Sequence, residues 1–345
     1  RILSPAGLLR AALEPFSARP HPDDISVGQF IAERFGDEVS RAVVDPLLGG
    51  IHAADLDTFS LVVAAPALGQ TVRKGDSIVA RTLRHNAGGW WTRLRHHSQR
   101  SGPRTPATAT WEHGLVTLPE ALAEGLTVHT NTRATGIRQV GHEWIVDATG
   151  PRGVGSVAVD DVIIATPARI AAALLATACP PAAELLSQCE SATVATLVMR
   201  ADLTGHPIAT AQTWFIGSAW SPLVRQVTNL SMKWHLAEPT FRITVGRQGG
   251  TPIDDLSDDD LVAITVAELR RLGLALDPRD PIIERHRGAM PQPAPGHRER
   301  MAQLTATLDG TGLHVGGAGI DGAGVGTAIV AGRRLAHHIT SEEEN

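Results

Sequence analysis

The sequence predicts a mixed α/β fold in which a helical region and an antiparallel sheet accompany part of a nucleotide-binding unit. Three observations predict this fold class. A short β-branched run, Leu313–Val315, is followed by six glycines within eleven residues and then by an alanine-rich helical pattern. Alternating β-rich runs occupy much of residues 192–246. Capped helical patterns occupy residues 4–36.

The glycine-rich turn after Val315 predicts a site where a ligand lies against bare backbone. Residues without a Cβ turn sharply and leave their N–H groups open to a ligand at the start of a helix. The spacing Gly317-x-Gly319-x-x-Gly322 matches the dinucleotide-binding fingerprint. A complete fingerprint unit has a second strand and an acidic residue about 20 residues further on, whereas this helix runs directly into residues 341–345. The turn therefore ends a nucleotide-binding fold, or it is a plain strand-to-helix turn.

Helices are predicted at the start of the chain. Ser4 is a favourable N-cap with Pro5 at the first helical position, and Ser26 caps a second helix that ends at Gly36. No glycine fingerprint precedes them, and the sequence begins without methionine. We therefore expect an N-terminally incomplete fold; a truncated gene product, a misplaced start or an engineered boundary would each explain it.

The middle of the chain changes from mixed elements to an antiparallel sheet. Strands are predicted over residues 128–137, 143–148, 157–166, 192–200, 213–217 and 241–246. Helices are predicted over residues 168–178, 182–188 and 258–272, the last one capped by Ser257. Residues 73–110 are rich in arginine, with tryptophans among the cations, and we interpret them as a solvated helix and loop.

Composition places the protein among soluble globular chains of two or more domains. It has 345 residues, of which 43% are hydrophobic and 19% charged, and no apolar run has the length of a membrane span. A net charge of −5 provides no basic footprint for nucleic acid. Cys179 and Cys189 are too few for a disulfide framework and fit no zinc pattern, so we expect a reduced cytoplasm and no metal. Peripheral membrane contact stays open.

Four blocks resemble the FAD-dependent protoporphyrinogen and coproporphyrinogen oxidases, which belong to the amine-oxidase-like flavoproteins. Gly317–Gly332 is similar to the C-terminal flavin-contacting motif of that family. Pro46–Leu61 resembles its P-L-x-x-G-I-x-A-G-D block with the following L-S-L, and Ser231–Trp234 resembles its S-x-K-W motif. Glu284–His297 resembles its R-W-x-x-A-M-P-Q-Y-x-x-G-H block.

The chain departs from the family pattern at several positions. Ala54 stands where the family prefers glycine, and His286 and Pro293 replace a tryptophan and a tyrosine that lie toward the flavin. We therefore expect altered packing of the flavin. His52 stands where the family commonly has tyrosine, and we expect it to pack or to form a hydrogen bond rather than to act as a base.

The resemblance implies a fold with the FAD/NAD(P)-binding domain of amine-oxidase-like flavoproteins and four segments. They are residues 1–110, a helical substrate- or membrane-facing domain; 111–167, part of the FAD-binding domain; 168–285, the substrate-binding sheet domain; and 286–345, the rest of the FAD-binding domain. The implied cofactor is FAD, whose reduced ring carries negative charge that a helix N-terminus stabilises. By position, the cofactor-binding residues are Ala134, His286, Gly317, Gly322, Ala323, Gly324 and Val325.

Five residues are candidates for contact with the substrate. Lys233 is the candidate carboxylate partner, with a surface lysine on a strand as the alternative. The candidate apolar wall consists of Phe215, Ile216, Met232 and Trp234, with core packing as the alternative. No catalytic side chain and no metal are expected, since the flavin performs the oxidation.

The activity implied by the resemblance is oxidation of coproporphyrinogen III to coproporphyrin III, with O2 as the electron acceptor. The alternatives are a protoporphyrinogen IX oxidase, another amine-oxidase-like flavoenzyme, and an inactive truncated remnant. The implied partners are the porphyrinogen, O2 and a ferrochelatase that receives the product; nucleic acid is not among them.

Overall fold

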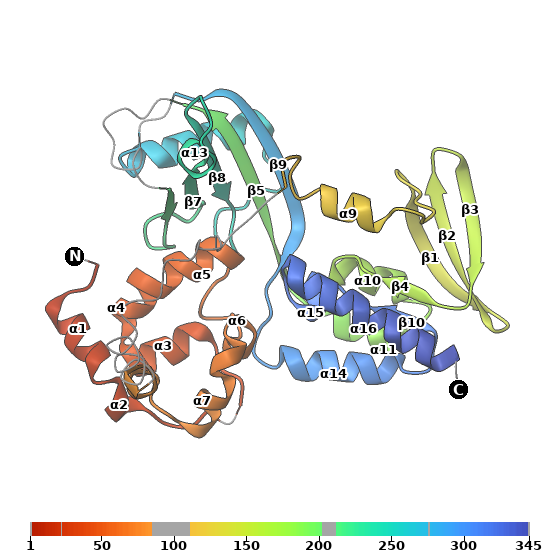
Figure 1. The fold of residues 1–345 in the computed structure, drawn as a ribbon, viewed down its shortest axis with the longest axis horizontal. Coiled ribbons are helices and arrows are strands. Elements are labelled where there is room, and N and C mark those ends of the chain that lie inside the picture. Colours follow the sequence, from red (N-terminus) through yellow and green to blue (C-terminus); the bar gives the residue numbers. More distant parts are fainter. Residues whose placement is uncertain (1, 22, 85–110, 202–211, 275–276, 344–345) are drawn as a thin grey trace, which may run out of the picture.

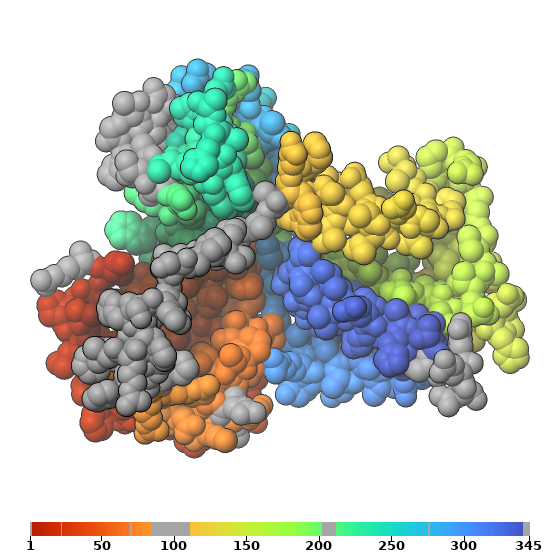
Figure 2. All heavy atoms as spheres, viewed as in Figure 1, coloured from red at the N-terminus to blue at the C-terminus, as the bar shows by residue number. Residues whose placement is uncertain are grey.

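The computed structural model describes residues 2–21, 23–84, 111–201, 212–274 and 277–343. These residues form three lobes that meet near the centre of the view in Figures 1 and 2. We call them the helical lobe (residues 2–84), the sheet lobe (strands β5 to β9 with their helices) and the α/β lobe (residues 111–187 and 297–343). The N-terminus lies in the helical lobe and the C-terminus in the α/β lobe.

The helical lobe is built from short helices around a small apolar core. Its elements are α1 (Pro5–Ala12), α2 (Glu14–Ser17), α3 (Val27–Phe35), α4 (Asp37–Val39), η1 (Ser40–Val44), α5 (Asp45–His52), α6 (Leu61–Ala64), η2 (Pro66–Leu68) and α7 (Gly69–Lys74). The predicted caps are confirmed, because the Ser4 and Ser26 hydroxyls accept N–H hydrogen bonds at the starts of α1 and α3. A fully buried ion pair, Arg34 to Glu14 at 3.0 Å, ties α3 to α2.

The sheet lobe contains a five-stranded antiparallel sheet with strand order β6-β7-β8-β5-β9. Its elements are β5 (Ser191–Arg200), β6 (Thr213–Phe215), β7 (Val224–Asn229), α12 (Leu230–Trp234), β8 (Thr240–Val245), α13 (Asp258–Arg271) and β9 (Arg279–Pro291). Buried residues from β5, β7 and β8 form its core with apolar residues of α13, so the helix covers one face of the sheet. The long strand β9 runs from the far end of this lobe to the junction of the lobes (Figure 1).

The α/β lobe combines a three-stranded antiparallel sheet with a parallel strand pair. Its elements are α9 (Thr117–Leu122), β1 (Arg133–Val140), β2 (Glu143–Gly150), β3 (Gly153–Val159), β4 (Val162–Ile164), α10 (Ala168–Leu175), α11 (Pro180–Ser187), α14 (His297–Leu308), β10 (Leu313–Val315), α15 (Ala318–Asp321) and α16 (Val325–Glu343). β10 pairs with β4 in parallel, so segments 151 residues apart in sequence lie side by side. This parallel pair places the glycine-rich turn at the carboxyl ends of both strands, where α/β folds bind ligands.

The predicted strand, turn and helix at the end of the chain are confirmed, with one addition. β10 and α16 are the predicted strand and helix, and a single turn of helix, α15, lies between them. Asp321 closes this turn, because its carboxylate accepts a hydrogen bond from the Gly317 N–H at 2.9 Å. The same carboxylate receives a second hydrogen bond, at 3.0 Å, from Arg334 of α16.

Two local predictions are wrong. Residues 157–166 form parts of two strands, β3 and β4, because the polar pair Asp160 and Asp161 interrupts the apolar pattern between them. Lys233 lies on the short helix α12 rather than on a strand. The Asn229 side chain starts this helix by accepting the Met232 N–H at 3.1 Å. No finding tests the predicted domain limits; the limit between residues 285 and 286 lies inside β9.

Candidate active site

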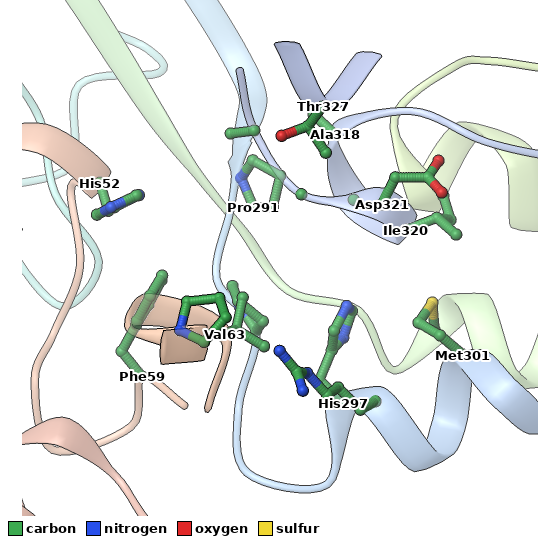
Figure 3. A pocket seen from close by; sticks show the side chains of 16 residues that line it. His52, Phe59, Val63, Pro291, His297, Met301, Ala318, Ile320, Asp321 and Thr327 are labelled. Atoms are coloured by element: carbon green, nitrogen blue, oxygen red, sulfur yellow. The ribbon is translucent and has the colours of Figure 1, made fainter. Parts of the chain in front are cut away.

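A cleft of about 310 Å³ lies where the three lobes meet (Figure 3). Its size is that of a small-molecule site, and its lining is mostly apolar. Three segments line it: the end of α5 with α6, the junction of β9 and α14, and the glycine-rich turn. The lining residues are His52, Phe59, Val63, Pro66, Pro291, Pro293, His297, Arg298, Met301, Ala318, Gly319, Ile320, Asp321, Gly322, Ala323 and Thr327.

The glycine-rich turn forms one wall of the cleft with exposed backbone. Gly317, Gly322 and Gly324 have φ angles of +114°, +104° and +136°, which residues with a Cβ rarely adopt. The next residue, Val325, begins the 19-residue helix α16. The first N–H groups of a helix have no partner within it and carry partial positive charge. The turn therefore presents bare backbone and a helix N-terminus beside the cleft.

The opposite wall belongs to the helical lobe. His52 is the last residue of α5, and its ring lies against that of Phe59 with centroids 5.4 Å apart and planes at 36°. Figure 3 shows this pair facing Ile320 and Asp321 across the cleft. Burial lowers the pKa of His52, which favours the neutral imidazole. The next residue, Ala53, adopts the left-handed conformation at φ +55° and ends the helix.

The base of the cleft contains buried polar atoms that have no partner among the described residues. His297 begins α14, and its Nδ1 is one of these atoms. Burial, and secondly the positive charge of Arg300, lower the pKa of His297. Next to the cleft, Gln292 lies between two lining prolines without lining the cleft itself; its Nε2 donates to the His52 carbonyl at 2.9 Å, while its Oε1 accepts no hydrogen bond from the described residues. Buried polar atoms of this kind call for a ligand or water.

These features fit a flat, partly polar ring such as a flavin. The cleft has apolar surfaces for the ring faces, supplied by residues such as Phe59, Pro291 and Met301. A cradle of glycine backbone lets the ring approach closely. Gly319 has little room for a larger residue, because an added Cβ would lie 3.3 Å from the Cβ of Ala168. The N-terminus of α16 supplies the positive partial charge that suits the reduced ring.

The structure brings five of the seven predicted cofactor residues to one turn beside the cleft. Gly322 and Ala323 line the cleft directly, and Gly317, Gly324 and Val325 belong to the same turn. Ala134 is exposed on β1, where it pairs with Ala148 at a different part of the α/β lobe. His286 is exposed in the middle of β9 and does not line the cleft. The roles of these residues stay predictions.

The predicted substrate residues all lie in the sheet lobe, outside the cleft lining. Phe215 is 39% exposed and packs against α5 at Gly50. Ile216 is 7% exposed and belongs to the core of the sheet lobe. Met232 and Trp234 are partly exposed on α12, and Lys233 places its ammonium 5.2 Å from the centroid of the Trp234 ring. None of these five residues lines the cleft, and their roles also stay predictions.

Sequence reasoning missed most of the cleft lining outside the glycine-rich turn. Phe59 and His297 had a signal, since they lie in the two blocks that resemble the family. The pairing of His52 with Phe59 had none, because the six residues between them follow no regular spacing that places one ring on the other. Cys179 and Cys189 are free, and no metal-binding cluster occurs among the described residues. No helix in the described ranges is long and apolar enough to cross a bilayer.

The chain belongs to the family of flavin-containing amine oxidoreductases, whose family model matches residues 3–340. Its relatives include the coproporphyrinogen III oxidase of Bacillus subtilis, 28% identical over 346 residues that cover 96% of this chain and 71% of that protein. The coproporphyrinogen III oxidase of Mycobacterium tuberculosis is 31% identical over 335 residues, which cover 94% of this chain and 69% of that protein.

A solved structure confirms the fold class. The crystal structure of a putative protoporphyrinogen oxidase from Exiguobacterium matches with a TM-score of 0.77 and 21% identity, and covers 99% of this chain and 73% of that one. Family membership confirms FAD as the cofactor and the protein as an oxidoreductase. The cleft beside the glycine-rich turn is therefore the candidate active site.

Proposed function

We propose that the protein oxidises coproporphyrinogen III to coproporphyrin III with FAD as cofactor and O2 as electron acceptor. The observation that carries the proposal is the cleft itself, in which the glycine-rich turn and the start of α16 face an apolar wall that includes Phe59. The identities to relatives named coproporphyrinogen III oxidase support this choice of substrate.

The cofactor supplies the redox chemistry, because a bound flavin accepts a hydride and passes its electrons on to oxygen. The residues of the chain bind and orient the cofactor and the substrate, and they exclude water from the cleft. Pro291 and Met301 provide apolar surface beside the ring, and the glycine-rich turn holds its polar edge through backbone N–H groups. The dipole of α16 favours the negative charge of the reduced state.

The substrate brings a large apolar macrocycle with carboxylate side chains. Partly exposed apolar residues of the sheet lobe, Phe215, Met232 and Trp234, form the proposed wall for the macrocycle. Lys233 is the proposed carboxylate partner, since its ammonium is oriented by the Trp234 ring. Substitution Lys233→Met should raise the KM for coproporphyrinogen III and leave kcat near that of the wild type, because the lysine contacts a remote carboxylate.

The second candidate substrate is protoporphyrinogen IX, favoured by the similarity to a chloroplastic protoporphyrinogen oxidase of Spinacia oleracea, 28% identical over 200 residues. Purified protein assayed anaerobically with each porphyrinogen decides between the two. Bleaching of the flavin absorbance by coproporphyrinogen III, with slower bleaching by protoporphyrinogen IX, supports the proposal. Bleaching by protoporphyrinogen IX alone would reject it in favour of the second candidate.

Two further proposals concern the surroundings of the enzyme. An exposed apolar strip on α1 and α2, consisting of Leu8, Leu9, Leu13 and Phe16, supports peripheral membrane contact in the cytoplasm. Sedimentation with phospholipid vesicles, compared with a Leu9→Ser/Phe16→Ser double variant, tests that contact.

We also propose that the porphyrin product passes to a ferrochelatase, which a pull-down with product-loaded protein would detect.

A further inference from the structure

His52 faces the candidate active site from a backbone that is fixed on three sides. Its carbonyl oxygen accepts a hydrogen bond from Gln292 Nε2 at 2.9 Å, and the carbonyl of Gly50 accepts one from Arg225 at 3.0 Å. On the other side, the Ala53 carbonyl accepts a hydrogen bond from the Gln248 N–H at 2.9 Å. The ring itself rests on Phe59. The imidazole is therefore held in place before any ligand arrives.

The proposed reaction creates a need for a proton acceptor at this wall. The first two-electron oxidation of a porphyrinogen breaks one C–H bond at a bridging carbon and one N–H bond at a pyrrole, and one new double bond forms. Both electrons leave with the hydride from carbon, for which the flavin is the acceptor. The proton from nitrogen leaves without electrons and must go to a base positioned near the macrocycle.

We infer that His52 is the base that accepts this proton, in place of the packing role that its sequence position predicts. The inference rests on the proposed oxidation of a porphyrinogen and adds a role for a residue of this chain. His52 lies on the wall opposite the glycine-rich turn, so a macrocycle stacked between the flavin and the helical lobe reaches its ring. The proton afterwards passes from the imidazole to water, which returns His52 to its neutral form.

The local electrostatics suit a base. Burial lowers the pKa of His52, so the imidazole is neutral near pH 7 and has a free lone pair. Its position at the end of α5 places it beside the negative end of the helix dipole, which stabilises the imidazolium once it forms.

Other charged groups around the His52 imidazole form hydrogen bonds with other partners. Within the cleft, Asp321 is bound by Gly317 and Arg334, and Arg298 donates to the Val62 carbonyl at 2.8 Å. Behind α5, Arg225 and Arg247 donate to backbone carbonyls.

The other imidazole in the cleft is a weaker candidate. His297 is buried, only 7% exposed, whereas His52 is half-buried and therefore more accessible to a substrate in the cleft. Its ring lies at the base of the cleft beside α14, away from the wall where His52 lies (Figure 3). We therefore assign the proton to His52.

The test compares His52→Gln with His297→Gln and with His142→Gln, a matched control in the exposed turn between β1 and β2. The rate of flavin bleaching by coproporphyrinogen III is measured anaerobically from pH 5 to pH 9. In the wild type, the rate should fall about tenfold per pH unit below the pKa of His52 and level off above it. Loss of the base should slow bleaching by about 100-fold or more at pH 8 and remove this pH dependence. His142→Gln should match the wild type.

A second readout needs no turnover. The imidazole C–H resonances of the FAD-free protein, assigned by their loss in His52→Gln, should titrate with a midpoint below 6.5, the usual value for histidine. A midpoint well above that value would overturn the inference, because the ring would already carry a proton near pH 7.

The outcomes separate this inference from the proposed function. If the wild type fails to bleach with any porphyrinogen, the proposed function is overturned and the assignment with it. If the wild type bleaches, and His52→Gln bleaches at the same rate with the same pH profile, only the role of His52 is overturned. Slow bleaching by His297→Gln alone would transfer the role to His297. An unchanged visible flavin spectrum in each variant shows that the cofactor site is intact.

Discussion

The buried guanidinium of Arg225 donates a hydrogen bond from Nη1 to the backbone carbonyl of Gly50 at 3.0 Å. This contact joins β7 of the sheet lobe to the last turn of α5, two residues before His52. The same nitrogen lies 3.3 Å from the Gly49 carbonyl. Burial, and secondly the charge of Arg247, lower the pKa of Arg225 to about 10, so the group stays protonated near pH 7. The sheet lobe thus determines where one wall of the cleft lies.

Substitution Arg225→Met should destabilise the protein. It leaves the buried carbonyls of Gly49 and Gly50 without their donor, and we expect a loss of ~1–3 kcal/mol in the free energy of unfolding. Urea unfolding measures this loss. Arg152→Met, which alters an exposed arginine in the turn between β2 and β3, is the control and should change the free energy by less than about 0.5 kcal/mol. Equal free energies of unfolding for the two variants would show that the hydrogen bonds from Arg225 do not stabilise the protein.

Substitution Gly50→Ala should disturb the packing between α5 and β6. The new Cβ would lie 2.4 Å from Cδ1 of Phe215, so the ring must move. The gain of ~1 kcal/mol in helix propensity is smaller than the upper range of the overpacking cost, ~1–3 kcal/mol. We expect a net loss of stability in thermal unfolding. The matched control is Gly332→Ala in α16, where an added Cβ meets nothing within 4 Å and the protein should become more stable. A Gly50→Ala variant more stable than the wild type would contradict the close packing of Gly50 against Phe215.

Substitution Gly324→Ala should weaken FAD binding. Gly324 has a φ of +136° in the turn beside the cleft, and an L-residue there is strained by ~1–3 kcal/mol. If the turn shifts to relieve that strain, the FAD dissociation constant should rise by about tenfold or more, since ~1.4 kcal/mol corresponds to a factor of ten. Titration with FAD followed by flavin fluorescence gives the constants.

Gly310→Ala is the matched control for that experiment. Gly310 also has a positive φ, +66°, but it lies between α14 and β10 and does not line the cleft. The Gly310→Ala variant should lose stability through the same kind of strain, but it should keep its affinity for FAD. Equal FAD affinities in the two variants would show that the turn at Gly324 does not hold the cofactor.

The free energy of unfolding should fall in mild acid because His297 becomes protonated. Its folded-state pKa is lowered by burial and by Arg300, so the folded protein favours the neutral ring. The stability from this group is therefore present above the unfolded-state pKa and is lost as the pH falls through the folded-state value. For one proton, the loss is at most ~1.4 kcal/mol per pH unit.

Urea unfolding at pH 7, 6 and 5 measures this dependence. His297→Gln should show a shallower fall than the wild type, whereas His142→Gln, with an exposed ring, should fall as the wild type does. Parallel curves for His297→Gln and the wild type would refute the contribution of His297.

The fold class and the glycine-rich turn could be predicted because each follows from local sequence. Strand, turn and helix near the C-terminus have distinct patterns, and the caps at Ser4, Ser26 and Ser257 are short-range signals. α12 could not be predicted in this way, because one Asn229 side chain starts it and the left-handed His235 ends it. A pattern of five residues is too short to distinguish a helix from a strand.

The rest of the site depends on contacts distant in sequence. His52 and Gln292 are 240 positions apart, and the hydrogen bond between them exists only once the helical lobe packs on β9. The position of His286 shows the same limit of prediction from sequence. The resemblance places it near the flavin, and only the structure shows that the register of β9, an edge strand of the sheet, pairs it with Val194 of β5. Neither relationship follows from periodicity or spacing.

The crystal structure of the protein with FAD is the most direct measurement of the central claim. We expect the isoalloxazine ring to lie in the cleft, with its polar edge on the backbone of Gly322 to Val325 and one face toward the wall formed by His52 and Phe59. A ring bound anywhere else on the protein, with this cleft left to solvent, would contradict it.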